Sequence, residues 1–362
     1  MSKAAELAAL IGSGQAQGNR NLIINGAMSV AQRGTSSTAA SYKTVDRFFY
    51  SSANLDNHAF TQTQQAVTDL AGFTNSWRIT TTTAESAIAA DELVYVAQKI
   101  EAQNLQKLSY GTSSAKRVTL SFYVKSSVTG TFSTNLYQTD DSRIVNSEYT
   151  ISSANTWERK EITYPADQTG VIDNNNGTGL YVTWNLALGS NWKGNAATAW
   201  EVYSTNNWSG AGTYTDAVVT TINSTWEITG VQLEIGEVAT AFEVEDFGTT
   251  LAKCQRYYYQ LVQGSYMIVG MNDTTSNCET SFGLPVEMRA DPALGTSGTS
   301  SEYSIRQNGS NITCDSGPTI LGSGGKNVVG IRFTKGSALN TSFASYCFGN
   351  TSGADLKLDA EL

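Results

Sequence analysis

The sequence has very few residues of the kinds that bind zinc or form disulfide frameworks. It contains one histidine, His58, and four cysteines among 362 residues: Cys254, Cys278, Cys314 and Cys347. The cysteines lie more than twenty residues apart and form no CxxC pair. Zinc sites and disulfide-rich scaffolds need closer spacings, so both are excluded. We expect free, buried thiols, with a disulfide formed after release into an oxidising medium as the alternative.

Charged residues are also scarce, at 15% of the chain, where about a quarter is usual. The formal net charge is −9, and no run of lysine or arginine occurs. Nucleic acid is therefore excluded as a partner, because phosphate binding needs a basic surface. The longest apolar stretches have the length of strands, which excludes membrane insertion. The opening MSKAAELAALIGSG shows no signal-peptide cleavage site, so we expect a protein made in a cytoplasm and left uncleaved.

Catalytic motifs are missing as well. His58 lies in NLDNHAFTQ, which has no nucleophile-elbow pattern, and there is neither a GxGxxG turn nor a Walker loop. The sequence therefore predicts no enzyme and no cofactor. Only paired carboxylates stay open, because a glycoside hydrolase can take its two acids from any distance in sequence. The available acids are Asp140, Asp141, Asp173, Glu234, Glu237, Glu243, Glu245 and Asp246.

Turns and solvated edges explain these acids better than catalysis does. Asp140 and Asp141 follow a predicted strand, where aspartate favours a hairpin turn. In VIDNNNGTG, Asp173, Asn174 and Asn176 offer oxygen ligands that suit calcium, but their spacing is not that of an EF-hand. We therefore predict no metal, and a type I′ turn at the Asn176–Gly177 pair.

The polar residues that are present suit strands and turns better than helices. Thr, Ser, Asn and Gln supply the polar surface, and residues 118–125 alternate apolar and polar side chains, with one face in a core and the other in water. Residues 104–110 are expected to form a short helical or turn connection that ends at Gly111. The spacing of strands without intervening helices predicts a mainly β fold, an antiparallel sandwich. Further strands are expected at residues 77–82, 95–101, 131–138, 156–164, 180–188 and 225–233.

The composition divides the chain into three parts. Residues 1–20 place Leu7, Leu10 and Ile11 on one side of a short helix, for oligomerisation or attachment, or as a frayed terminus. Residues 21–247 form the sandwich. Residues 248–362 form a smaller C-terminal β domain, because prolines become more frequent there and a brief helical stripe begins at Leu251, with Cys254 and Tyr258.

Several stretches resemble tail-fibre and virion structural proteins of marine and cyanobacterial tailed phages. They occur in order along nearly the whole chain: NLIINGAMSVAQRG (21–34), TVDRF (44–48), GFTNSWRIT (72–80), VAQKIEAQNLQKLSYGT (96–112), VTLSFYVKSS (118–127), WEITGVQLEIGEVATAFE (226–243), LAKCQRYYY (251–259) and LKLDAEL (356–362). The middle region is also similar to the jelly-roll of carbohydrate-binding modules. The phage resemblance implies a homotrimeric or otherwise oligomeric appendage on a virion that is assembled in the host cytoplasm together with other virion proteins.

The sequence thus predicts a tail fibre or receptor-binding component that contacts host surface polysaccharide. A rigid sandwich would recognise sugars with aromatic rings beside hydrogen-bonding groups. The candidate rings in residues 189–215 are Trp192, Trp200, Tyr203, Trp208 and Tyr214. Packing of loops or subunits explains these rings at least as well. The alternatives for the whole protein are a capsid-bound fibre or decoration protein without a receptor role, and a polysaccharide-degrading tail spike.

Overall fold

The structure is a computed structural model that describes residues 19–194, 198–261, 267–296, 299–321, 325–337, 339–350 and 354–362. The predicted helix with Leu7, Leu10 and Ile11 lies outside these residues. The chain divides into two compact units, of which the larger runs to Thr250 and includes Leu362, and the smaller spans Leu251–Glu361. The boundary expected at about residue 247 is close to this division. No helix in the described ranges is long and apolar enough to cross a membrane.

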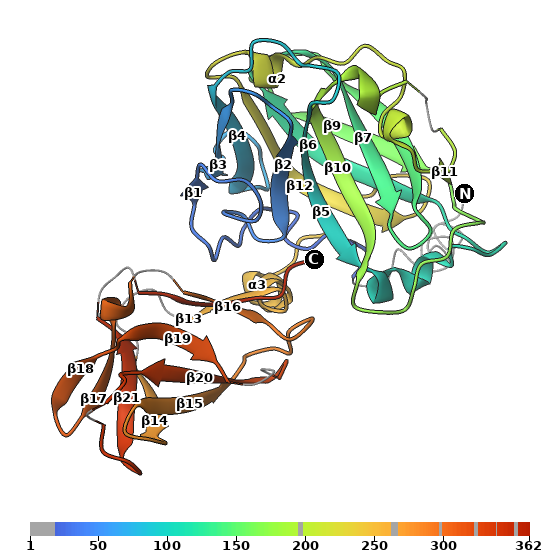
Figure 1. Cartoon of the computed structure of the whole chain (residues 1–362). Coiled ribbons are helices and arrows are strands. Elements are labelled where there is room, and N and C mark those ends of the chain that lie inside the picture. Colours follow the sequence, from blue (N-terminus) through green and yellow to red (C-terminus); the bar gives the residue numbers. More distant parts are fainter. Residues whose placement is uncertain are drawn as a thin grey trace. The chain divides into compact units, whose positions relative to one another are not determined.

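The larger unit is a sandwich of two six-stranded antiparallel sheets (Figure 1). In hydrogen-bonding order, the first sheet comprises β1 (Ser36–Ser37), β3 (Ala59–Ala66), β4 (Asn75–Thr83), β12 (Thr225–Ile235), β6 (Val118–Ser126) and β9 (Glu158–Tyr164). The second comprises β11 (Glu201–Val202), β8 (Arg143–Ile151), β7 (Gly130–Gln138), β10 (Thr178–Leu188), β5 (Leu93–Glu101) and β2 (Phe48–Ala53). The chain crosses repeatedly between the sheets, as in a jelly-roll, so the predicted mainly β fold is confirmed.

The core between the sheets follows from the alternation of side chains along each strand. Val118, Leu120, Phe122 and Val124 on β6 are fully buried in the same cluster as Trp184 of β10. Phe122 meets Trp184 edge to face at 5.7 Å between ring centroids. Burying side chains of this size stabilises the fold by roughly 2 kcal/mol each. This shared core joins the two sheets into one unit.

One sequence-based expectation for this unit needs correction, and a second is confirmed with shifted bounds. The outer face of β6 is not uniformly wet, because Thr119 and Ser121 are also buried. The Thr119 hydroxyl donates to the carbonyl of Gly236, so the chain after β12 covers this end of the strand. The connection predicted at residues 104–110 is a 3₁₀ helix, η1 (Ala102–Leu108), and its last turn ends at Ser109, which has a positive φ. The unit also contains η2 (Ser190–Trp192), η3 (Thr205–Asn207) and α2 (Ala217–Thr220).

Motifs that carry the phage resemblance build hydrogen-bonded corners of the fold. Asn25, with φ of 61°, donates from Nδ2 to the carbonyls of Val30 (2.9 Å) and Asp46 (3.0 Å), and its Oδ1 accepts from the amide of Val30 (3.0 Å). Near the end of WEITGVQLEIGEVATAFE, the Glu243 carboxylate accepts from the amides of Asn19 and Asn21. These residues therefore fix the backbone conformation, and Glu243 holds the start of the described chain beside the segment that follows β12.

The smaller unit has a three-stranded and a seven-stranded sheet. The three-stranded sheet comprises β13 (Tyr258–Leu261), β22 (Leu356–Asp359) and β16 (Ala293–Thr296). The seven-stranded sheet comprises β18 (Ser310–Thr313), β17 (Tyr303–Gln307), β21 (Ala344–Gly349), β14 (Met267–Asn272), β15 (Asn277–Gly283), β20 (Val328–Thr334) and β19 (Ser316–Ile320), with η4 (Ser300–Glu302) before β17.

The core of the smaller unit includes Tyr303, Phe333, Cys278 and Cys347. The helical stripe predicted near the boundary is α3 (Phe247–Gln255), which contains Leu251 and Cys254. Tyr258 is not part of this helix, because it is the first residue of β13, where its strand pairs with β22.

Candidate functional site

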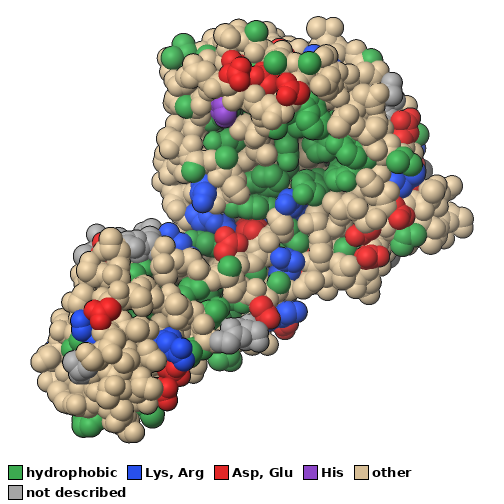
Figure 2. All heavy atoms as spheres, in the orientation of Figure 1, with side chains coloured by type: hydrophobic (Ala, Val, Ile, Leu, Met, Phe, Trp, Pro, Cys, Tyr) green, Lys and Arg blue, Asp and Glu red, His purple; other side chains and the backbone are tan. Residues whose placement is uncertain are grey.

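Half-buried tyrosines line the outer face of the β11–β8–β7–β10–β5–β2 sheet. Neighbours along a strand point to opposite faces, so Tyr95 on β5, Tyr181 on β10 and Tyr137 on β7 point outward where Val96, Val182 and Leu136 enter the core. The register sets Tyr181 opposite both Tyr137 and Lys99. Figure 2 shows the hydrophobic side chains of this face gathered in one broad area over β5 and β10.

Trp208 is the centre of this aromatic face, which we define as Tyr95, Tyr137, Tyr181, Tyr203 and Trp192 around Trp208. The Trp208 ring centroid lies 5.5 Å from that of Tyr95, 6.0 Å from those of Tyr137 and Tyr203, and 6.5 Å from that of Trp192. Trp208 itself is only 6% exposed. It therefore supports the rings around it and offers little surface of its own.

Hydrogen bonds from the sheet hold the loop that carries Trp208. The indole Nε1 donates to Oδ1 of Asn185 (2.8 Å), and Nδ2 of Asn135 donates to the Trp208 carbonyl (2.9 Å). Nδ2 of Asn146 donates to the carbonyl of Asn207 (3.0 Å). These three asparagines are buried on the outer face of the sheet, so the loop replaces water as their partner.

A cation borders the aromatic face. Nζ of Lys99 lies 4.9 Å from the ring centroid of Tyr181 and 5.4 Å from that of Phe49, within the range of cation–π attraction. Burial raises the pKa of Tyr181 to about 12 and also raises the pKa of Tyr95 and of Tyr203. At neutral pH these phenols are therefore uncharged and can both donate and accept hydrogen bonds.

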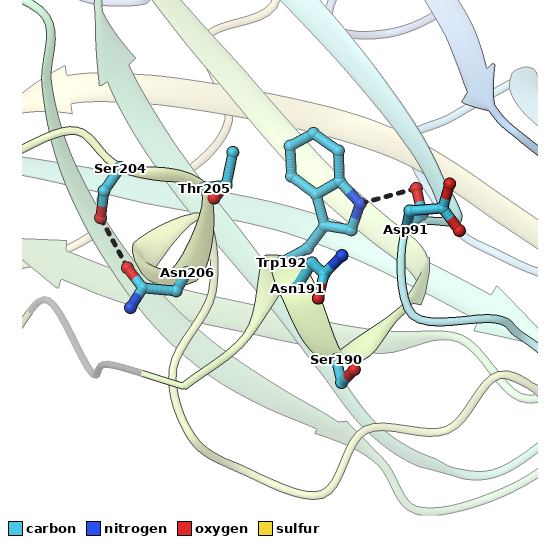
Figure 3. A pocket seen from close by; sticks show the side chains of 7 residues that line it. All are labelled: Asp91, Ser190, Asn191, Trp192, Ser204, Thr205 and Asn206. Carbon is cyan, nitrogen blue, oxygen red and sulfur yellow. Dashed lines mark hydrogen bonds between the residues drawn. The ribbon is translucent and has the colours of Figure 1, made fainter.

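A pocket lined mostly by residues with polar side chains adjoins the face at Trp192 (Figure 3). Its volume is about 590 Å³. Nε1 of Trp192 donates to the carbonyl of Asp91 (3.0 Å), and the Ser204 hydroxyl donates to Oδ1 of Asn206 (2.6 Å). The pocket is lined by Asp91, Ser190, Asn191, Trp192, Ser204, Thr205 and Asn206. One aromatic wall beside amides and hydroxyls suits a ligand rich in hydroxyl groups.

The five rings named from the sequence fall into two groups. Trp192 and Tyr203 belong to the exposed part of the aromatic face. Trp200 and Tyr214 do not line it, because they are 8% and 7% exposed and hydrogen-bond to Pro165 and Glu148. These two rings and Trp208 pack the loops against the body, which leaves them little surface for a sugar.

Sequence reasoning missed Tyr95, Tyr137 and Tyr181. A usable signal exists, because each of these tyrosines occupies an outward position directly beside an aliphatic core residue, Val96, Leu136 or Val182. Such a position usually carries a small polar residue when it faces only water. A large ring there indicates a covered or ligand-binding face.

Two of the acids considered for catalysis, Asp140 and Asp141, hold a loop. Asp140 and Asp141 lie in the turn between β7 and β8, and their carboxylates accept from the amides of Asp173 (3.0 Å) and Val171 (2.7 Å). Burial raises the pKa of Asp140. The type I′ turn expected at Asn176–Gly177 is wrong, because neither residue has a positive φ.

The residues considered for calcium and the single histidine have local structural contacts. In the Asp173 loop, the Asn175 side chain closes a turn by accepting from the Gly177 amide (2.7 Å). Within the described ranges, no group of three or more His, Cys, Asp or Glu side chains could hold a metal ion. His58 lies 3.2 Å from the Ser52 hydroxyl and packs against Phe60, with 5.3 Å between ring centroids.

Comparison with known proteins gives only distant similarity. No family model and no curated protein matches the chain. Among solved structures, the chain is similar to the enzymatically active domain of tailspike protein 4 of bacteriophage CBA120 (TM-score 0.32, 13% identity), covering 60% of this chain and 22% of that one. It is also similar to a family 11 carbohydrate-binding module of Clostridium thermocellum (0.28, 12%), covering 57% and 98% of the respective chains. At this distance the similarities do not assign a function.

Proposed function

We propose that the larger unit binds a polysaccharide on its aromatic face and does not cleave it. The observation that carries this proposal is the group of half-buried rings Tyr137, Tyr181 and Tyr95 on the outer face of three neighbouring strands, where Tyr181 lies opposite Tyr137 and Tyr95 lies four residues along β5 from the position opposite Tyr181. A sugar ring has an apolar C–H face and a rim of hydroxyls. Aromatic faces pack against the first, and phenol hydroxyls, amides and Lys99 bind the second.

The rigidity of the site favours binding. Trp208 is held by the sheet through two hydrogen bonds of 2.8 and 2.9 Å, and it braces four of the surrounding rings. A pre-organised surface loses little conformational entropy when a ligand binds. The pocket at Trp192 extends the same surface with polar groups, so a chain of several sugar residues fits better than a single sugar.

Binding without cleavage is supported by two acids of this unit, Glu148 and Asp167, whose carboxylates are engaged in structural hydrogen bonds. Glu148 accepts a hydrogen bond from the Tyr214 hydroxyl (2.8 Å), and Asp167 pairs with Arg143 (2.7 Å) and accepts from the amides of Thr169 and Gly170. Carboxylates that hold structure in this way are poorly placed to exchange protons with a substrate.

We further propose that the chain is an oligomeric appendage of a phage virion, with the polysaccharide of a host surface as ligand. The support is the ordered sequence resemblance, and the low charge and acidic balance agree with an extracellular role. Several copies on one particle would raise avidity, so weak individual sites suffice. Light scattering of the full-length chain and of a chain lacking residues 1–20 tests the oligomer. A full-length trimer that dissociates to monomers when residues 1–20 are removed supports the oligomeric appendage. A monomer in both forms contradicts it.

The binding proposal is tested with the purified full-length chain on an array of bacterial surface polysaccharides, followed by calorimetry with the best ligand. Tyr181→Ala should weaken binding about tenfold, the loss of one ring contact worth ~1.4 kcal/mol. Tyr123→Ala is the matched control, because Tyr123 is a half-buried tyrosine on the opposite sheet.

Three results would overturn the proposal. The first is an array on which no polysaccharide is retained. The second is an equal loss of affinity in the two tyrosine variants, since that would place the ligand away from the aromatic face. The third is release of new reducing ends from the bound polysaccharide, which would make the protein a hydrolase.

A further inference from the structure

Two buried thiols lie in close contact inside the smaller unit. Sγ of Cys347 on β21 is 3.2 Å from Sγ of Cys278 on β15, and both side chains are fully buried. The two residues are far apart in sequence, and both belong to the core cluster of this unit. The separation is shorter than an ordinary contact between two sulfur atoms, so the pair is more than neighbouring core residues.

A glycine makes room for this contact. β14 lies between β21 and β15 in the sheet, and its Gly270 has no side chain. A Cβ at this position would come within 2.9 Å of Cys278 Sγ and 2.7 Å of the carbonyl of Glu279. The sheet also curls, so that some Cα atoms of β15 and β21 lie within 8 Å of one another. The two sulfurs therefore meet across a strand that would separate them in a flat sheet.

The contact is directional. The Cys347 thiol donates its hydrogen to Cys278 Sγ, and this hydrogen bond lowers the pKa of Cys278 and raises that of Cys347. Cys314 lies in the same core, where burial raises its pKa to about 12. Since the thiolate is the reactive form of cysteine, Cys278 is the nucleophile among these thiols.

We propose that Cys278 and Cys347 are a peroxide-sensitive pair that closes to a disulfide and staples β15 to β21. In the first step, the Cys278 thiolate attacks one oxygen of hydrogen peroxide. The S–O bond forms, the O–O bond breaks, and the leaving hydroxide takes up a proton to give water. In the second step, Cys347 loses its proton and attacks the Cys278 sulfur, which forms the S–S bond and releases the Cys278 hydroxyl as a second water.

The movement needed is small. A disulfide bond is about 2.05 Å long, so the two sulfurs must approach by roughly 1 Å. A peroxide molecule is small and uncharged, and it reaches a buried pair more easily than a bulky disulfide reagent does. The disulfide would form when the protein leaves a reducing cytoplasm, because thiols are kept reduced there, whereas disulfides form and persist in an oxidising medium.

The test uses the folded full-length chain with hydrogen peroxide as the only oxidant. After the peroxide is removed with catalase, free thiols are blocked with N-ethylmaleimide in denaturant, and the digested protein is analysed by mass spectrometry. The expected product links the peptides of Cys278 and Cys347, leaves Cys254 and Cys314 alkylated, and is reversed by dithiothreitol. Limited proteolysis of the smaller unit should be slower after oxidation.

Two variants keep the test decisive. In Cys347→Ser, the link cannot form, and dimedone should trap a sulfenic acid at Cys278. In Cys254→Ser, the matched control, the link should form as in the natural chain. Four thiols that stay alkylatable after peroxide treatment, a link to Cys314, or a link that forms only in the unfolded chain would each overturn the proposal. None of these outcomes depends on polysaccharide binding.

Discussion

Replacing Trp208 with alanine should strongly lower the stability of the larger unit and also weaken polysaccharide binding at its aromatic face. The indole is 6% exposed and contacts four aromatic rings, so its removal leaves a cavity the size of a large side chain. Substitutions of this kind lower the free energy of unfolding by roughly 3–5 kcal/mol. The largest losses are expected where neighbours cannot collapse into the space, and here Tyr95 and Tyr137 are fixed on strands.

A subtler variant separates packing from hydrogen bonding. Trp208→Phe keeps most of the ring contacts but removes the donor to Oδ1 of Asn185, which is buried. An unsatisfied buried acceptor costs about 1–3 kcal/mol. Trp192→Phe is the matched control, because its indole donates to the carbonyl of Asp91, an exposed residue to which water can bind instead. We expect the control to lose less than about 1 kcal/mol.

The distribution of tryptophan makes the assay specific for one unit. All seven tryptophans of the chain lie between residues 77 and 226, so fluorescence during urea unfolding reports on the larger unit alone. Polysaccharide binding by the folded variants is measured in parallel. If Trp208→Ala lowers the free energy of unfolding by less than about 1 kcal/mol, or if both phenylalanine variants lose the same amount, the central role of Trp208 is refuted.

The remaining predictions concern other parts of the larger unit, and the two substitutions among them are followed by the same tryptophan fluorescence. Asn25→Ala should lower the free energy of unfolding by ~3 kcal/mol, because it removes three hydrogen bonds and places alanine at a positive φ. Asn25→Gly should lower it by about 1 kcal/mol less, because glycine adopts a positive φ without strain. Equal losses in the two variants would contradict this account. Gly26→Ala should lower the free energy of unfolding by more than about 1 kcal/mol, because a Cβ there would lie 2.1 Å from the Val231 carbonyl oxygen. An unchanged urea midpoint would contradict this, since it would mean that the backbone moves aside without loss of stability. Burial raises the pKa of Tyr181 and Tyr214 from 10.0 to about 12, so their contribution to stability is complete below about pH 10 and is lost as the pH rises toward 12. Ultraviolet titration should show these late phenols, and a full phenolate signal by about pH 11 in the folded chain would contradict the burial.

The strands could be predicted because their signal is local. The alternation at residues 118–125 identified β6, and the expected strand at 156–164 differs from β9 only in its first residues. The errors arose where a distant segment acts on a strand or turn. The alternation predicts that Thr119 is exposed, but the chain after β12 covers it. The Asn176–Gly177 pair predicts a tight hairpin turn, but the neighbouring Asn175 side chain closes the loop instead.

The candidate site was predicted only in part for the same reason. The sequence indicated an aromatic loop, and Trp192 and Tyr203 do lie at the exposed face. It could not show that Trp208 turns inward, because this depends on Asn185 and Asn135, which lie on two different strands. It also could not show that Tyr95, Tyr137 and Tyr181 share a face, since this follows from the pairing register of three strands.

The sequence by itself therefore determined the mainly β class, the strand positions, the low content of charged residues and the acidic net charge, and it contains the ordered motifs on which the proposed appendage role rests. Those properties depend on composition and on a two-residue period, which any stretch of chain displays on its own. Only the tertiary structure decided which rings meet around Trp208 and that Cys278 touches Cys347 across Gly270. Such contacts join residues far apart in the chain, and they exist only once the sheets have paired and curled.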